Sequence, residues 1–100
     1  MPVSEELGKA ARSGKLILGA KKSLKALKRG LAKAVIVAAN CPERVFSDIR
    51  HYTKIGQVPL HVFEGDSREL GIACGKPFTI NVVTVVEQGE SSILSAVEGK

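Results

Sequence analysis

The order of apolar and polar residues along the chain predicts helices that alternate with strands. After Pro42, apolar residues follow helical spacing at Val45, Ile49 and Tyr52. The Val-Ile-Val run at 35–37 is instead typical of a strand that is covered on both faces. The same patterns along the whole chain predict helices at residues 4–12, 20–29, 42–56, 66–73 and 91–97, and strands at residues 15–18, 32–40, 58–63 and 78–87.

Local signals predict where several of these elements end. Ser4 is a suitable N-cap for the first helix, and Asp66 with Glu69 three residues later resembles a capping box. Gly30 is expected to end the second helix. The alternation of strands and helices indicates one domain over residues 1–100, with an α/β fold class: a three-layer α/β/α sandwich. The first three strands are expected to be parallel or mixed.

The charge balance of the chain is basic. Fifteen Lys and Arg residues against ten Asp and Glu give a net charge of +5, which fits a polyanion as partner but is also an ordinary charge for a soluble domain. The distribution is more informative than the total. Seven of the fifteen cations lie within residues 15–33, so this segment is the first candidate for an anion-binding surface.

The predicted helix at residues 20–29 places lysines on the side opposite its apolar stripe. Lys21, Lys25 and Lys28 share that side, and Lys22 adjoins them. Gly19 precedes the helix and allows a ligand to approach the backbone and the free N–H groups of the first turn. The alternative is an amphipathic helix whose lysines only keep one face in water. However, acidic partners at helical spacing, which would stabilise such a face, are absent.

Two further segments are expected to meet this glycine at one edge of the sheet. Asn40 ends the second strand, so it either presents its amide at the carboxyl edge, together with Gly19 and the turn at 65–67, or belongs to the N-cap region of the next helix. Phe78 follows Lys76 at a junction between loop and strand. If the last strand is antiparallel to its neighbours, the Phe78 ring reaches the same edge and can stack on an unpaired base. The alternative is a buried ring.

The sequence offers little that points to catalysis. His51 and His61 are isolated, and the chain has no Ser-His-Asp or Cys-His pattern, no P-loop and no metal-binding spacing. We therefore expect no enzyme, cofactor or metal. Cys41 and Cys74 lie 33 residues apart without a Cys-x-x-Cys motif, which favours reduced thiols. The absence of an apolar signal peptide or membrane-spanning run favours a cytoplasmic location. Few amides beside many Lys and Glu residues resemble a thermophile composition.

Several motifs in this order resemble a known family. They are Leu-Gly-x-Lys-x-Ser at 18–23, Ala-Ala-Asn-x-Pro at 38–42, and Glu-Leu-Gly at 69–71 followed by Gly-Lys-x-Phe at 75–78. With the segments around them, they are similar to the large-subunit ribosomal protein thirty family of archaea and eukaryotes, within the kink-turn RNA-binding superfamily. The resemblance runs from about residue 5 to residue 94 without large insertions, and the lack of an N-terminal extension looks more archaeal than eukaryotic.

The resemblance implies a four-stranded mixed sheet and loops at one end of the sandwich that bind a sharply bent internal loop of RNA. It implies that the ring of Phe78 stacks on a flipped base and that Ile80 is a nearby apolar contact. The wider superfamily has an Asn-Glu pair where this chain has two lysines, which favours the ribosomal branch. Some relatives carry Asn where this chain has Ser67, and Arg where it has Val45. The RNA-binding residues expected in this chain are Gly19, Lys21, Lys22, Lys25, Lys28, Asn40, Arg44, Ser67, Lys76, Phe78 and Ile80.

The resemblance implies a structural component of the large ribosomal subunit, monomeric when free. Its expected partners are ribosomal RNA, neighbouring ribosomal proteins and its own messenger RNA, without a membrane. Three alternatives remain open at this point. The chain could serve a small ribonucleoprotein or regulate its own translation, bind a phosphorylated metabolite at Gly19 as an α/β enzyme, or act as an adaptor whose basic face meets an acidic protein.

Overall fold

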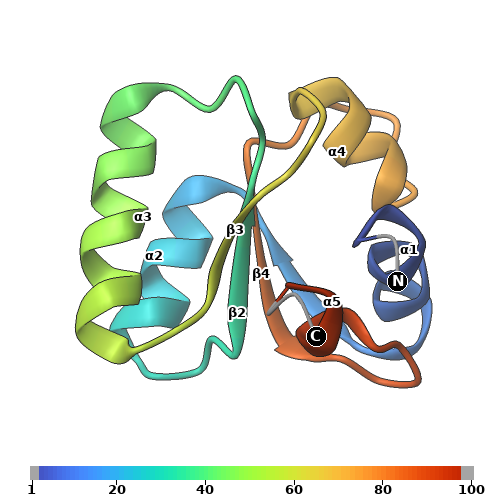
Figure 1. Cartoon of the computed structure of the whole chain (residues 1–100), viewed down its shortest axis with the longest axis horizontal. Helices are drawn as coiled ribbons and strands as arrows, with labels where there is room; N and C mark the ends of the chain where they lie inside the picture. Colours follow the sequence, from blue (N-terminus) through green and yellow to red (C-terminus); the bar gives the residue numbers. More distant parts are fainter. Residues whose placement is uncertain (1–2, 98–100) are drawn as a thin grey trace.

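The computed structural model describes residues 3–97 and contains the predicted alternation of helices and strands (Figure 1). The elements are α1 (Val3–Ser13), β1 (Lys15–Leu18), α2 (Ala20–Lys28), β2 (Ala34–Val37), α3 (Glu43–Gly56), β3 (Leu60–Val62), α4 (Ser67–Ala73), β4 (Val82–Glu87) and α5 (Ile93–Val97). The α/β fold class predicted from the sequence is confirmed.

The four strands form one mixed sheet in the order β1-β4-β2-β3. β2 and β3 are parallel, whereas β4 is antiparallel to both of its neighbours, β1 and β2. The end of β4 that follows the α4–β4 loop therefore lies beside the ends at which β1, β2 and β3 leave the sheet. The four connections at this edge, at the top of Figure 1, are close in space although they are far apart in the sequence.

Helices cover both faces of the sheet and give the sandwich two apolar layers. α2 and α3 lie on one face, and α1, α4 and α5 lie on the other (Figure 1). Alternate residues of β2 point to opposite faces. Ile36 joins the core under α1 and α4 with Leu7 and Leu70, whereas Val35 and Val37 join the core under α2 and α3. The continuous apolar run of β2 is explained by this burial on both faces.

Two predicted boundaries need correction, and a third is confirmed. Ser4 lies inside α1, which already includes Val3, so it is not the N-cap of that helix. The final strand begins at Val82 rather than at Phe78, because the preceding residues form a loop that packs on α4. Gly30 does end α2: its φ is +72°, and the N–H groups of residues 30 and 31 bond back to the last turn of the helix.

A buried carboxylate connects the first and last helices. Glu6 of α1 accepts a hydrogen bond of 2.6 Å from the N–H of Ser92, immediately before α5, and pairs with Lys9 at 3.4 Å. The hydrogen bond from the Ser92 backbone is the main cause that holds the pKa of Glu6 below its ordinary value. This contact joins α1 to the start of α5, and neither helix belongs to the four connections at the top of Figure 1, so Glu6 serves the fold rather than the surface described next.

Candidate nucleic-acid interface

Backbone hydrogen bonds join the loops at the edge of the sheet where β4 begins. The N–H of Gly19, before α2, donates to the carbonyl of Val82 at 2.9 Å. The N–H of Ala39, after β2, donates to the carbonyl of Gly65, after β3, at 2.9 Å. The N–H of Ala38 donates to the carbonyl of Asn81 at 2.9 Å and links these two pairs, so the segments beside all four strands form one continuous surface. We call this surface the loop rim, and it comprises residues 19–22, 38–44, 64–67 and 75–81.

The side chain of Asn40 joins two segments of the loop rim. Its Oδ1 accepts a hydrogen bond from the N–H of Ser67 at 2.8 Å, and its Nδ2 lies 3.5 Å from the Ser67 hydroxyl. Ser67 begins α4, whose N-cap Asp66 accepts from the N–H of Glu69, as the predicted capping box requires. The helix that follows Asn40 has Pro42 as its N-cap and no side-chain cap. The amide of Asn40 therefore satisfies an N–H group of a different helix, α4.

Gly19 forms an open start for α2. It occupies the N-cap position with φ +100° and ψ 152°, a conformation that residues with a Cβ rarely adopt, and it provides no side-chain cap. Apart from Gly19 and its two chain neighbours, no heavy atom of the described residues lies within 4 Å of the position that a Cβ would take. The first N–H groups of α2 are therefore available to a ligand, and they carry the partial positive charge of the helix start. Lys21 and Lys22 are exposed in this first turn.

The lysines of α2 form an exposed basic face. Lys21, Lys22, Lys25 and Lys28 are all exposed, and the one ion pair among residues 3–97 is that between Lys9 and Glu6 on α1. Lys28 differs from the others because its ammonium lies 5.2 Å from the centre of the Tyr52 ring. Seven residues separate it from Lys21, which is about 10 Å along the helix axis. Lys28 therefore lies down the side of the sandwich rather than on the loop rim.

Phe78 is exposed on the loop rim, so the alternative of a buried ring is wrong. Its side chain is 55% exposed, because the loop from α4 to β4 crosses directly over Gly71. A Cβ at Gly71 would overlap the carbonyl oxygen of Phe78, and the N–H of Lys76 donates to the carbonyl of Gly71 at 2.9 Å. The glycine of α4 thus sets the position from which the aromatic ring points to solvent.

The structure buries one of the predicted contact residues. Ile80 is only 4% exposed and belongs to the core with Leu70. Its N–H donates to the carbonyl of Ser67 at 2.9 Å, so it anchors the loop from below. Val45 is half-buried against the core under α3, whereas the neighbouring Arg44 is exposed in the first turn of that helix.

The two cysteines are free thiols, one of them beside Asn40. Cys41 is half-buried on the loop rim, and burial raises the pKa of its thiol. Cys74 is buried at the end of α4, where burial raises its pKa to about 11 although the charge of Lys76 acts in the opposite direction. Both groups are therefore protonated at neutral pH, and Cys74 in particular is a poor nucleophile.

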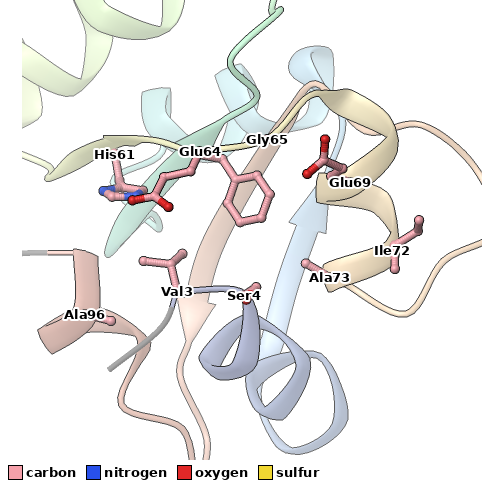
Figure 2. Close-up of a pocket in the computed structure, with 10 residues that line it drawn as sticks. Val3, Ser4, His61, Glu64, Gly65, Glu69, Ile72, Ala73 and Ala96 are labelled. Carbon is pink, nitrogen blue, oxygen red and sulfur yellow. The ribbon is translucent and has the colours of Figure 1, made fainter.

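A hollow of about 700 Å³ lies away from most of the loop rim, between α1, β3, α4 and α5. Figure 2 shows the carboxylate of Glu64 beside the ring of His61, and Glu69 on α4 across the hollow. Among residues 3–97, no Lys or Arg lines it, so these residues do not give it the charge that a phosphate requires. Within residues 3–97, no cluster of His, Cys, Asp and Glu could hold a metal ion, and no helix is long and apolar enough to cross a membrane.

Sequence patterns did not single out Arg68 and Ile72 of α4. Ile72 is 65% exposed, and both residues line a hollow of about 380 Å³ that Phe78 also lines. Their spacing of four residues on a helix is a signal of a shared face, but the helix is short and the partner segment arrives from the loop after it. Only the three-dimensional structure brings Phe78 to this face.

This chain is similar to known proteins in sequence and in fold. Large ribosomal subunit protein eL30 of Methanosphaera stadtmanae is 42% identical over 98 residues, which cover 98% of this chain and 100% of that protein. The eL30 protein of Yarrowia lipolytica is 43% identical over 94 residues, which cover 94% of this chain and 86% of that protein. A solved structure of a Bacillus halodurans protein, described as of unknown function, has a TM-score of 0.85 at 28% identity and covers 98% of this chain and 97% of its own.

A sequence signature covers nearly the whole chain. It is described as that of the ribosomal protein L7Ae/L30e/S12e/Gadd45 family, and it matches residues 1–95. The archaeal and eukaryotic eL30 relatives cover the same length with about two residues in five identical. The chain therefore belongs to the ribosomal protein L7Ae/L30e/S12e/Gadd45 family.

Proposed function

We propose that this protein is a structural, non-catalytic component of the large ribosomal subunit, and that it binds an internal loop or kink-turn of ribosomal RNA through the loop rim. The relatives that support a ribosomal role are named large ribosomal subunit proteins, not enzymes. In this role the protein is located in the cytoplasm, on the ribosome, beside other ribosomal proteins. It is monomeric before assembly.

The observation that carries the RNA contact is the position of Phe78. An exposed aromatic ring lies on the same rim as the open start of α2 and the amide of Asn40. An unpaired base offers a flat face to the ring, and base stacking on an aromatic side chain contributes about 1–3 kcal/mol. A sharp bend in RNA provides such unpaired bases, whereas a regular duplex keeps its bases inside the helix.

The remaining residues of the loop rim, and the lysines that follow it along α2, are suited to the RNA backbone. Lys21, Lys22 and Lys25 neutralise phosphates, and Gly19 admits the sugar-phosphate chain to the N–H groups of α2. Lys28 extends the basic face to the flanking stem. Arg44 and Lys76 contribute charge at the other side of the loop rim, while Asn40 and Ser67 hold its centre and offer a polar edge to a base.

Binding to two matched RNAs tests this proposal. One RNA carries an asymmetric internal loop that folds into a kink-turn, and the other has the same length and flanking sequence with the loop replaced by paired bases. We expect at least tenfold tighter binding to the bent RNA at physiological salt. Equal affinity would leave only non-specific electrostatic binding and would overturn the proposed role of the loop rim.

Crosslinking in a cell lysate separates ribosomal binding from translational self-control or a small ribonucleoprotein. After crosslinking, the RNA attached to the protein is sequenced. Large-subunit ribosomal RNA is the expected product. Exclusive recovery of the protein's own messenger or of a small guide RNA would assign the loop rim to one of those partners instead. A bound nucleotide without RNA would favour the metabolite-binding enzyme, and an acidic protein would favour the adaptor.

A further inference from the structure

The exposed side of α4 forms a hollow with the loop that carries Phe78. Arg68, Ile72, Lys76 and Phe78 line this hollow of about 380 Å³, together with Pro77 and Thr79. It lies on the side of α4 away from the core, since Ile72 is 65% exposed while its neighbours Leu70 and Gly71 are buried. None of the residues expected from the family resemblance, apart from Lys76 and Phe78, belongs to it.

The hollow exists because the loop packs closely on α4. Gly71 leaves room for the carbonyl of Phe78, and its own carbonyl accepts from the N–H of Lys76 at 2.9 Å. The loop therefore packs against Gly71, the residue before Ile72. The apolar side chains of Ile72 and Phe78 form walls of the same hollow. Arg68 precedes Ile72 by one helical turn and is also exposed.

The chemistry of the lining selects an anionic ligand with a flat apolar part. Of the described residues that line it, two are charged, Arg68 and Lys76, and none is a carboxylate. The larger hollow, which Ile72 also lines, has the opposite character: among the described residues, Glu64 and Glu69 line it without Lys or Arg. A nucleotide combines an anionic phosphate with a base that can lie against Ile72 and Phe78.

We propose that this hollow binds one extrahelical nucleotide of the RNA, next to the bend held by the loop rim. The inference rests on the proposed function, because the hollow shares Lys76 and Phe78 with the loop rim. The base lies against Ile72, and Arg68 pairs with the phosphate on its 5′ or 3′ side. The site recognises a nucleotide by shape and charge, with no requirement for one base.

Binding of two kink-turn RNAs tests the site. The first carries a single extrahelical 2-aminopurine next to the bend, and the second carries an abasic residue at that position. Wild-type protein is expected to bind the first RNA about tenfold more tightly than the second. Binding should also change the fluorescence of the 2-aminopurine. Ile72→Ser should remove that preference and leave binding to the abasic RNA unchanged. Arg68→Ala should weaken binding to both RNAs by the same factor, because the abasic residue keeps its phosphate. Ile55→Ser is the matched control, because Ile55 is 67% exposed at the other end of α3.

The outcomes separate this inference from the proposed function. If Ile72→Ser keeps the wild-type preference and Arg68→Ala binds both RNAs as tightly as the wild type, while Phe78→Ala loses binding to both RNAs, the nucleotide site is wrong and the loop rim stands. If all of these variants, including Phe78→Ala, bind both RNAs as tightly as the wild type, the nucleotide site and the RNA-binding role of the loop rim are both wrong. Dimerisation that depends on protein concentration and disappears in Ile72→Ser would assign the hollow to a second copy of the chain and overturn the nucleotide site.

Discussion

The side-chain amide of Asn40 caps α4 by accepting the N–H of Ser67 at 2.8 Å, across 27 residues of sequence. This bond fixes the loop after β2 against the turn after β3, so two strands present their ends as one surface. Because Asn40 remains exposed, the same amide is available to a ligand. Asn40 thus joins the stability of the loop rim to its proposed binding role, and a suitable substitution can separate the two.

Asn40→Asp keeps an oxygen that accepts from Ser67 but loses the amide donor and adds a negative charge beside the RNA. We expect the melting temperature to stay close to that of the wild type while the affinity for bent RNA falls at least tenfold. Asn40→Ala removes the acceptor as well and should also lower the free energy of unfolding by about 1 kcal/mol. Wild-type RNA affinity in Asn40→Asp would restrict Asn40 to the helix cap.

Lys21→Ala tests the phosphate contacts of α2. Each phosphate contact contributes about 0.7–0.9 to the slope of log affinity against log salt concentration, so the slope should become shallower by about that amount. Lys54→Ala is the control, because Lys54 is exposed in the last turn of α3, about 16 Å along the helix from its start at the loop rim. An identical loss of slope in both variants would indicate a general charge effect rather than a contact at position 21.

Gly71→Ala tests how α4 positions Phe78. The added Cβ would overlap the carbonyl oxygen of Phe78, so the loop must move and both stability and RNA affinity should fall. Gly8→Ala is the matched control, since Gly8 lies in α1, where a Cβ finds ordinary contacts at 3.5 Å. Alanine there should stabilise the helix by about 0.5–1 kcal/mol. Unchanged RNA binding in Gly71→Ala would contradict the role of this packing.

The acid stability of the fold depends on Glu6. Because the pKa of Glu6 lies below its ordinary value of 4.5 in the folded protein, the unfolded chain binds more protons in the acid range. The stabilisation is therefore complete above pH 4.5 and is lost as the pH falls through the folded pKa. Melting curves from pH 7 to pH 3 should show a difference in melting temperature between wild type and Glu6→Gln that is greatest at pH 7 and narrows in acid. A difference that is constant with pH would contradict this.

The sequence predicted the elements of the fold because its signals there are local. Apolar periodicity identified α2 and α3, and the spacing of Asp66 and Glu69 predicted the cap of α4 that the structure confirms. If β4 is antiparallel to its neighbours, the loop before it lies at the edge where the other strands end. The sheet confirms that direction of β4. These inferences need no knowledge of distant contacts.

The errors concern positions that tertiary contacts decide. Residues 78–81 have the composition of a strand, but packing on Gly71 bends them into a loop and turns Phe78 outward. The same bend buries Ile80, which the family resemblance placed in contact with RNA. The hydrogen bond between Asn40 and Ser67, and the hollow beside Ile72, join segments far apart in the chain. Periodicity and spacing carry no signal for such pairs.

Phe78→Ala, measured on the bent RNA and on the matched duplex, tests the central claim most directly. The ring is exposed, so its removal should leave the melting temperature nearly unchanged. We expect binding to the bent RNA to weaken by about 1–3 kcal/mol, with almost no change for the duplex, because only the bent RNA offers an unpaired base to the ring. Ile55→Ala serves as the control for loss of an exposed apolar side chain. Equal weakening on both RNAs, or none on either, would contradict the account.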